Sequence, residues 1–329
     1  MKHVCILIPE TAVPAAILDP QYMFTAVNEF FQSSGHQPFF RVELVAATRE
    51  VHLNNGMFIA RADKLLTEVQ QCDILFVPAI SRDVQTALDK NREAVEWIHS
   101  MYKRGTEVAS LCIGAFLVAE SGILQGKTCS THWLFANEFR TRYPDVELAD
   151  GRIVTDMHGV YSSGGATSYW NLLLYLVEKF TSREMAIMAS KFFLLDTAKN
   201  SQLPFSIFQG QKDHGDELVL VVQDFLESHY NERLSVDEIA EQFCVGRRTF
   251  ERRFKKATNN TIVEYLQRVK IEAAKKQLEA GRKTVNEVMF EVGYTDTKAF
   301  RDVFKKITGL SPVEYRNKYY KELRMAQSI

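Results

Sequence analysis

The chain has 329 residues, of which 46% are hydrophobic and 25% charged, and its 40 basic and 41 acidic side chains leave a net charge of −1. That length and apolar content predict two globular domains, each with a core of its own. No apolar run reaches the 18 residues of a membrane span, and the start of the chain shows no signal-peptide cleavage site. The five cysteines are odd in number and lack metal-ligand spacing, which favours reduced thiols over a disulfide framework or a zinc site. We therefore expect a cytoplasmic protein without a metal and without a membrane partner.

The first two thirds of the chain alternate apolar runs with helical patterns. Continuous apolar runs at 3–8, 72–78 and 106–111 are typical of buried parallel strands, and helical patterns at 22–31 and 91–102 lie between them. Strands that alternate with helices predict a doubly wound α/β sheet. Glycine-rich phosphate loops of the G-x-G-x-x-G or G-x-x-x-x-G-K-[ST] type are absent, so we expect no nucleotide or other cofactor.

A cysteine at a sharp turn is the main chemical feature of this first part. Cys112 lies in Ser110-Leu-Cys-Ile-Gly114, where the third apolar run meets a helical pattern over 113–120. This is the layout of a nucleophile elbow, which holds a side chain near backbone N–H groups and can lower the pKa of a thiol. His132 follows in Thr131-His-Trp133, and a cysteine with a histidine is the minimum for an activated thiol.

Three interpretations of Cys112 stay open at this point. The residue is a structural remnant at a tight elbow, a wall of a ligand-sensing pocket that responds to oxidation, or a catalytic nucleophile. For His132, a hydrogen-bonded position in a pocket or core is a simpler interpretation than a general base. Ligands of such sheets bind at the carboxyl ends of the strands, so the candidate ligand contacts are Cys112, Ile113 and His132.

Residues 1–195 resemble the PfpI/ThiJ superfamily, whose members are relatives of the class I glutamine amidotransferases. The resemblance rests on Cys112–Gly122, Gly126–Trp133 and Ser162–Ser168. It implies an amidotransferase-like α/β domain, and in enzymes of that superfamily the cysteine is the nucleophile and the histidine lies nearby. Many members also carry a carboxylate just after the first strand, where this chain has Ala15-Ala16. The proteases of the group have histidine where this chain has Ile113, and both departures count against an enzyme.

The last third of the chain repeats itself at an offset of 50 residues. Phe250-Glu-Arg-Arg-Phe-Lys-Lys256 is echoed by Phe300-Arg-Asp-Val-Phe-Lys-Lys306, and Val263-Glu-Tyr265 is echoed by Val313-Glu-Tyr315. Two copies of one supersecondary unit this close together predict a bipartite binding module.

Each copy contains the parts of a helix-turn-helix. Ser235-Val-Asp-Glu238 and Thr284-Val-Asn-Glu287 have the spacing of capping boxes, so a helix should begin at each. A short turn and a second helix follow, with two phenylalanines on its buried side and basic residues on the opposite side. We expect the two units at about 235–257 and 284–308, joined by a basic helix over about 263–280.

The charge of this part favours a polyanionic partner. Residues 247–329 hold about 20 Lys and Arg against about 10 Asp and Glu, so the remainder of the chain carries an excess of acidic residues. A segment with that charge is expected to attract DNA, with an affinity that depends strongly on salt.

Residues of about 215–320 resemble the AraC/XylS transcriptional regulators, on the strength of 246–256, 265–271, 292–294 and 309–316. The resemblance implies two helix-turn-helix units whose second helices enter successive major grooves. Asp302 stands where the family often has arginine, which implies a weaker grip by the second unit. Carried over by position, the base-edge contacts are Arg247, Arg248, Glu251, Arg252, Thr297, Lys298 and Arg301, and the phosphate contacts are Lys255, Lys256, Lys305 and Lys306.

Together the two parts resemble the GlxA-type subgroup of AraC regulators, which carry an amidotransferase-like domain. We expect a sensor and dimerisation domain over 1–196, a linker over 197–214 and a DNA-binding domain over 215–329. The expected function is sequence-specific regulation of transcription, modulated by a small-molecule effector of unknown identity. The expected partners are double-stranded DNA, that effector and a second copy of the chain, and RNA polymerase is allowed as a further partner. The alternative is a cysteine-dependent hydrolase or glyoxalase-like enzyme fused to a DNA-binding module.

Overall fold

The computed structural model describes residues 1–149, 151–196 and 201–320, and the chain divides into two compact units, Met1–Gln202 and Leu203–Ile329. The division falls inside the segment 197–214 that the sequence predicts as a linker, of which 197–200 lie outside the described residues. Within the described ranges, none of the helices combines the length and the apolar character that crossing a bilayer requires.

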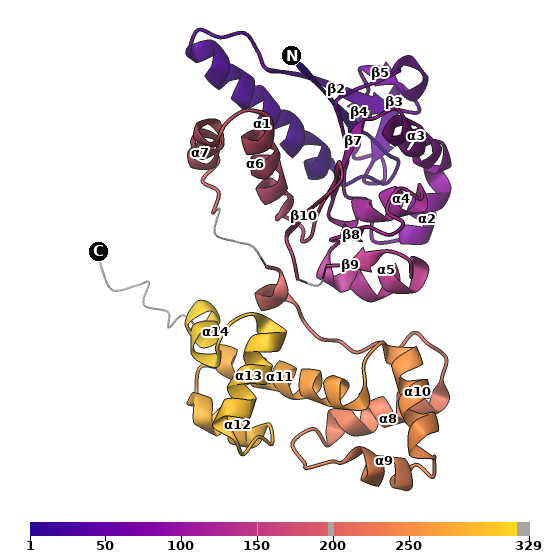
Figure 1. The fold of residues 1–329 in the computed structure, drawn as a ribbon, viewed down its shortest axis with the longest axis vertical. Helices are drawn as coiled ribbons and strands as arrows, with labels where there is room; N and C mark the ends of the chain where they lie inside the picture. Colours follow the sequence, from indigo (N-terminus) through magenta and orange to yellow (C-terminus); the bar gives the residue numbers. More distant parts are fainter. Residues whose placement is uncertain (150, 197–200, 321–329) are drawn as a thin grey trace, which may run out of the picture. The chain divides into compact units, whose positions relative to one another are not determined.

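The first unit is built on a seven-stranded sheet that is parallel except for its β10 edge (Figure 1). The three apolar runs predicted as strands are β1, β6 and β7 of this sheet, and the predicted doubly wound α/β fold is confirmed. Residues 4–7 of β1 are fully buried, as expected for a central strand covered on both faces. In spatial order the strands are β10 (Val154–Met157), β11 (Val160–Ser163), β7 (Glu107–Leu111), β6 (Ile74–Val77), β1 (Lys2–Leu7), β2 (Phe40–Ala46) and β5 (Lys64–Leu65). Two small sheets pair β3 (Glu50–Leu53) with β4 (Phe58–Arg61) and β8 (Thr128–Cys129) with β9 (Glu147–Leu148).

Helices cover both faces of the large sheet. Figure 1 shows α1, α6 and α7 on one side and α2, α3 and α4 on the other. Helix α1 begins eight residues before the predicted pattern at 22–31, because Pro14 stands at its first turn, where the missing N–H of proline does no harm. The helices are α1 (Pro14–Ser33), α2 (Val84–Lys90), α3 (Arg92–Lys103), α4 (Ala115–Glu120), α5 (Ala136–Arg142), α6 (Tyr169–Phe180) and α7 (Arg183–Phe192).

The described part of the second unit is helical, and its two halves are built alike. Two phenylalanines from each second helix and one tyrosine from the following helix fill each half's core, and each tyrosine hydroxyl donates to a glutamate at 2.6 Å. All four capping boxes form, including those predicted at Ser235 and Thr284. The helices are α8 (Glu217–Ser228), α9 (Val236–Gln242), α10 (Arg247–Thr258), α11 (Ile262–Ala280), α12 (Val285–Glu291), α13 (Thr297–Thr308) and α14 (Pro312–Tyr319).

Candidate DNA-binding face and candidate effector site

The sequence repeat produces the same local structure twice. Helix α10 follows Gly246 and helix α13 follows Asp296, and both helices end at a residue in the left-handed conformation. The last residue of each helix is a buried threonine: Thr258 Oγ1 donates to the carbonyl of Phe254 at 2.8 Å, and Thr308 Oγ1 donates to that of Phe304 at 2.8 Å. The C-terminal ends of the two helices are therefore closed in the same way, and both helices direct a pair of buried phenylalanines inward.

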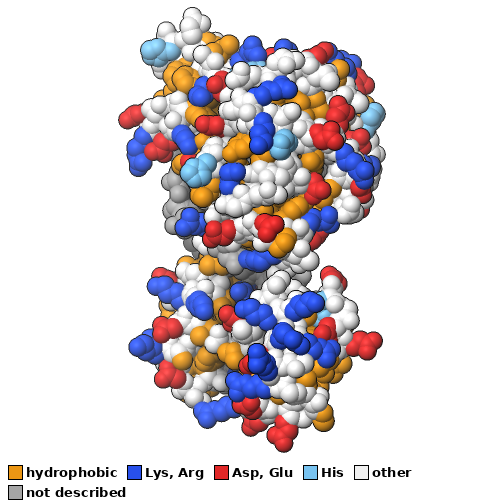
Figure 2. Space-filling model, turned by 45° about the vertical axis from the view of Figure 1, so that its right-hand side comes forward, with side chains coloured by type: hydrophobic (Ala, Val, Ile, Leu, Met, Phe, Trp, Pro, Cys, Tyr) orange, Lys and Arg blue, Asp and Glu red, His pale blue; other side chains and the backbone are white. Residues whose placement is uncertain are grey.

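The outward faces of α10 and α13 carry every residue that the sequence predicts to contact DNA. Phe250, Phe254, Phe300 and Phe304 are fully buried, so residues on the opposite side of each helix must face solvent. Figure 2 shows many Lys and Arg side chains on the displayed face of the second unit. Their roles in DNA binding stay predictions, but all are exposed: Arg247, Arg248, Glu251, Arg252, Lys255, Lys256, Thr297, Lys298, Arg301, Lys305 and Lys306.

One of the predicted base-edge residues, Arg247, pairs with two acidic groups in this structure. Arg247 Nη1 lies 2.8 Å from a carboxylate oxygen of Asp237, and Arg247 Nε lies 3.3 Å from Glu251 Oε1 one turn along α10. These pairs are exposed, and exposed ion pairs contribute little to stability. A phosphate or a guanine edge can therefore replace Asp237 as the partner of Arg247 at small cost.

Arg253 holds α10 in place through an ion pair that the sequence did not predict. Its guanidinium donates twice to the carboxylate of Asp216, from Nε at 3.0 Å and from Nη2 at 2.7 Å. Asp216 also caps α8 by accepting from the backbone N–H of Val219 at 3.2 Å. The hydrogen bonds from Arg253 hold the pKa of Asp216 below its usual range, although partial burial opposes them. One bidentate pair thus ties α10 to the start of α8, and the only sequence signal is the position of Arg253 beside the buried Phe250–Phe254 face.

Cys112 occupies a strained junction between β7 and α4. Its φ is 55°, a left-handed value that a side chain other than glycine adopts rarely, and a 3-10 turn over Cys112–Gly114 leads into α4. A Cβ at Gly114 would lie 2.4 Å from the carbonyl oxygen of Pro78 and 2.6 Å from that of Val77. The elbow is thus pressed against the end of β6, and only glycine fits at its third position.

The thiol of Cys112 is buried and protonated rather than activated. The residue is 5% exposed, and burial raises the pKa of the thiol to about 12, although a hydrogen bond from the Ile113 backbone N–H opposes the rise. Ile113 itself is equally buried. Asp19, an acid that follows the first strand, accepts a hydrogen bond from the Tyr169 hydroxyl at 2.6 Å. Desolvation and this bond raise the pKa of Tyr169.

Of the contacts that the structure describes, none joins His132 to the thiol of Cys112. The Nδ1 of His132 accepts a hydrogen bond from the Leu134 backbone N–H at 3.1 Å, so the ring caps the following turn. Burial, and secondarily the charge of Arg82, lower the pKa of His132. Among the described contacts, the link to the elbow is Thr131, whose Oγ1 donates to the carbonyl of Cys112 at 3.2 Å. This arrangement fits the simpler interpretation of His132 as a hydrogen-bonded histidine.

The buried thiol should resist alkylation. With a pKa of about 12, the thiolate fraction of Cys112 at pH 8 is on the order of one in ten thousand, and it rises about tenfold per pH unit. Cys244 is exposed and provides an internal control in the same chain. We expect iodoacetamide at pH 8 to modify Cys244 at least about a hundredfold faster than Cys112, as measured by peptide mass spectrometry. Equal rates would identify Cys112 as an activated thiol.

Gln202 is the second residue that the sequence analysis missed. It is 4% exposed, and its amide is fully used: Nε2 donates to the carbonyls of Thr131 and Arg152 at 3.1 and 3.0 Å, and Oε1 accepts from the Trp133 N–H at 3.2 Å. A Cβ at Gly164 would lie 1.8 Å from Gln202 Nε2, so this glycine leaves the room for the amide. The last residue of the first unit is therefore anchored to the loop that also contacts the Cys112 elbow.

One group of side chains in the first unit has the composition of a metal site. His3, Cys5 and Glu43 offer ligand atoms within 4.8 Å of one another. The carboxylate of Glu43 already lies 2.7 Å from His3 Nε2, 3.5 Å from Arg41 Nη2 and 3.9 Å from Lys64 Nζ. Because two permanent cations face that carboxylate, ion pairing accounts for the cluster and a further cation would be repelled.

Comparison with known proteins matches both parts of the chain. Residues 21–179 match the DJ-1/PfpI family, and residues 239–318 match a helix-turn-helix domain family. The HTH-type transcriptional regulator GbdR of Pseudomonas aeruginosa is 24% identical over 229 residues, which are 68% of this chain and 61% of GbdR. The chain thus spans less than two thirds of that relative's length. The HTH-type transcriptional regulator GlxA of Rhizobium meliloti is 19% identical over 84% of this chain and 85% of its own.

The solved structures support the fold of the first unit. A putative transcriptional regulator from Vibrio parahaemolyticus superposes with a TM-score of 0.52 at 21% identity, and the match covers 58% of this chain and 98% of that one. The predicted combination of an AraC-type helix-turn-helix with a PfpI-type domain is confirmed. In both parts the chain is therefore similar to HTH-type transcriptional regulators, with a DJ-1/PfpI-family match over residues 21–179 and a helix-turn-helix match over 239–318.

Proposed function

We propose that this protein is a sequence-specific DNA-binding regulator of transcription whose first unit binds a small-molecule effector. The observation that carries the proposal is the duplicated recognition helix: α10 and α13 have the same core, the same end geometry and an exposed basic face. A solvated basic helix is common in proteins, but two matched copies joined by one helix suit a duplex that presents its grooves at regular intervals.

The side chains of the two helices suit different parts of that task. Arg248 and Arg252 project from α10 as exposed guanidinium groups, and a guanidinium can donate to O6 and N7 of guanine together. The lysines at the helix ends suit phosphates, which position the protein without reading sequence. Because α13 has Asp302 where α10 has Arg252, the second helix is expected to contribute less affinity than the first.

The carboxyl edge of the large sheet is the proposed effector site. Cys112 directly follows β7 there, and Ser163 is the last residue of the neighbouring β11, where it pairs with Leu111 at the end of β7. Ser163 is fully buried, and its hydroxyl has no hydrogen-bond partner among the described residues. Buried hydroxyls normally have partners, so an effector with a polar group could supply one. Such an effector would contact Cys112, Ile113 and the Thr131–His132 loop. The proposal thus adopts the interpretation of Cys112 as a wall of a ligand pocket rather than as a catalytic nucleophile.

The hydrogen bonds of Gln202 offer a route from that site to the connector. A ligand that moves the elbow acts on Thr131 through its bond to the Cys112 carbonyl, and Thr131 in turn accepts from Gln202. Further along the connector, Ser206 is held within the second unit, because Lys275 Nζ donates to its backbone carbonyl at 2.6 Å. Release of Gln202 would change the freedom of the second unit, and thereby the populations that bind DNA well or poorly.

A test of the regulator function needs no knowledge of the effector. The purified full chain is incubated with sheared genomic DNA from its source, and the fragments retained at physiological salt are sequenced. We expect a small set of fragments that share a motif spanning two adjacent major grooves. Retention without a motif, fading as salt rises, would mean that the basic faces bind only phosphate, and would contradict sequence-specific regulation.

The Gln202 contacts can be tested in the absence of DNA. Gln202→Leu keeps a similar volume but removes the acceptor of the Trp133 N–H and the donor to Thr131 and Arg152. We expect hydrogen exchange at the Trp133 amide to accelerate about tenfold to hundredfold, since the local opening then costs less. Gln209→Leu, at an exposed position of the connector, is the matched control and should leave that amide unchanged. Equal exchange in the two variants would remove the proposed route.

The first unit also offers a surface for a second copy of the chain. Leu18 and Tyr22 of α1 and Phe192 of α7 are exposed, and the rings of Tyr22 and Phe192 lie 6.3 Å apart, so the apolar side chains are contiguous. Contiguous exposed apolar side chains mark interaction sites. We therefore propose a homodimer through this surface. Sedimentation of the wild type and of Tyr22→Glu tests the dimer.

A cytoplasmic location and contact with RNA polymerase complete the proposal.

A further inference from the structure

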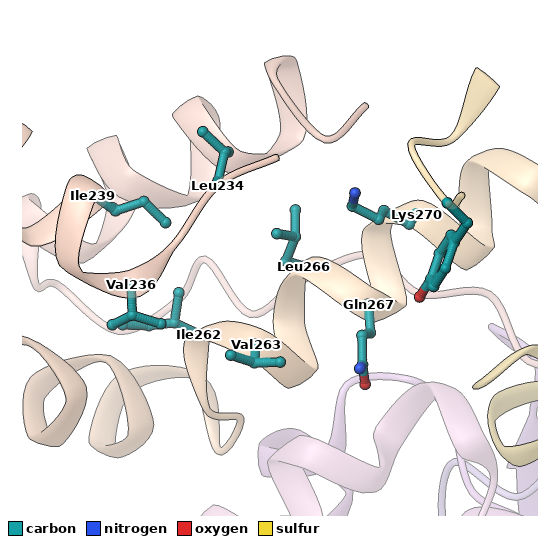
Figure 3. A pocket seen from close by; sticks show the side chains of 9 residues that line it. Leu234, Val236, Ile239, Ile262, Val263, Leu266, Gln267 and Lys270 are labelled. Atoms are coloured by element: carbon teal, nitrogen blue, oxygen red, sulfur yellow. The ribbon is translucent and has the colours of Figure 1, made fainter. Parts of the chain in front are cut away.

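One lysine of the second unit lies between its two helix-turn-helix halves. Lys270 is in the middle of α11, the helix that belongs to both halves, and is 8% exposed. Its Nζ donates to the carbonyl of Glu232, which precedes α9, at 3.3 Å and to the carbonyl of Gly293, in the turn before α13, at 3.5 Å. In Figure 3 the side chains of Leu266 and Lys270 leave α11 on the same side, whereas Gln267 points the other way.

The backbone segments that Lys270 joins also contact each other directly. A Cβ at Gly293 would lie 2.3 Å from the carbonyl oxygen of Asn231, so these two backbone segments approach each other closely enough that a residue larger than glycine would not fit at position 293. Next to this contact, Arg233 Nη2 donates to Thr295 Oγ1 at 3.1 Å. We call Asn231–Arg233, Gly293–Thr295 and Lys270 the junction. It connects the start of the first helix-turn-helix to the turn of the second.

The surroundings of Lys270 favour a hydrogen-bonding role over simple packing. Beside the junction lies a groove of about 200 Å³, lined largely by apolar side chains (Figure 3). Burial lowers the pKa of Lys270, because the charged form loses hydration there. An apolar residue of similar size would fill this place without that cost. A long side chain with a hydrogen-bond donor at its end can, in addition, bond to one carbonyl from each half at the same time. Besides Lys270 itself, the groove is lined by Leu234, Val236, Ile239, Ile262, Val263, Leu266, Gln267 and Tyr294.

We infer that Lys270 is a positioning residue that fixes the separation and twist of α10 and α13, and thereby sets the half-site spacing that the protein accepts. The inference rests on the proposed function. One inserted base pair moves a half-site by about 3.4 Å and rotates it by about 35°, a change that a rigid pair of helices cannot follow. A protein with a loosened junction can follow it, at the expense of affinity for the original spacing.

The experiment compares spacing discrimination in three folded proteins. The probes are the genomic fragment that the wild type retains most strongly, and two derivatives with one base pair inserted or deleted between its half-sites. Wild type and Lys276→Met are expected to bind the derivatives about tenfold more weakly than the original fragment. Lys276 lies on the same helix and is exposed, so its variant matches the loss of charge. For Lys270→Met we expect discrimination to fall to about threefold or less, with weaker binding of the original fragment.

Each outcome decides the inference. Undiminished discrimination in Lys270→Met, with wild-type circular dichroism, overturns it, as does an equal loss in Lys276→Met. If Lys270→Met does not fold, Arg233→Ala replaces it, because Arg233 is exposed and, among the described residues, its loss removes the bond to Thr295 alone. Discrimination as strong as that of the wild type in Arg233→Ala then overturns the junction's role. A wild type that selects no motif contradicts the proposed function instead, so the two failures are distinguishable.

Discussion

Arg252→Ala is expected to weaken binding to the selected DNA about tenfold to hundredfold and to relax base preference at one position of the motif. The guanidinium is exposed on α10 and, in the part of the chain that the structure describes, has no ion pair that would have to break first. A bidentate contact to guanine carries both affinity and specificity, so its loss should affect both. Fluorescence anisotropy on the wild-type motif and on its single-base variants measures the two effects separately.

Two further variants separate base reading from phosphate binding. Lys256→Ala removes one exposed charge from the same helix and should weaken all sequences to a similar extent, with a salt slope that is smaller by about one. Asp302→Arg places arginine at the position that corresponds to Arg252 and should raise affinity. If Arg252→Ala leaves the base preference intact, the assignment of α10 as the stronger reading helix is wrong.

Gly114→Ala should cost the first unit about 2–4 kcal/mol of unfolding free energy. The added Cβ would lie 2.4 and 2.6 Å from two backbone carbonyl oxygens, and backbone atoms at the end of a central strand cannot move aside as a side chain would. All three tryptophans, Trp97, Trp133 and Trp170, lie in the first unit, so urea unfolding followed by tryptophan fluorescence reports on that unit.

Gly105→Ala is the control for this substitution. Gly105 has a φ of +91°, but a Cβ there meets no atom within 4 Å, so its variant should lose about 1 kcal/mol through backbone strain alone. A loss in Gly114→Ala no larger than in Gly105→Ala would mean that the elbow tolerates a side chain. The tight contact between the elbow and the end of β6 would then not be what holds Cys112 in place.

Local sequence patterns were sufficient for much of this protein. The 50-residue repeat predicts both helix-turn-helix units because capping boxes and paired phenylalanines act within a few residues of each other, and Ser235, Thr284, Phe250 and Phe300 all occupy the predicted positions. The apolar runs predict β1, β6 and β7 for the same reason. The exposure of the residues predicted to contact DNA follows from helical periodicity once the buried face is known.

The sequence was less informative about Cys112. The elbow itself follows from the run Ser110–Gly114, because a strand that meets a helix at a glycine must turn sharply. Its reactivity does not follow, because a thiol pKa depends on burial and on neighbours from other segments. In the structure those neighbours desolvate the thiol, and His132 uses its Nδ1 to cap a turn instead.

By itself, then, the sequence determined the two-part organisation, the paired helices and the residues on their outward faces, since each depends on contacts between near neighbours in the chain. Only the tertiary structure decided how those parts are held. Arg253 meets Asp216 across 37 residues, Gln202 meets Thr131 across 71, and Lys270 joins carbonyls that lie 38 and 23 residues away in opposite directions. Each of these bonds needs a donor to meet an acceptor within about 3.5 Å, and no periodicity encodes that meeting, because the packing of several elements together sets the distance.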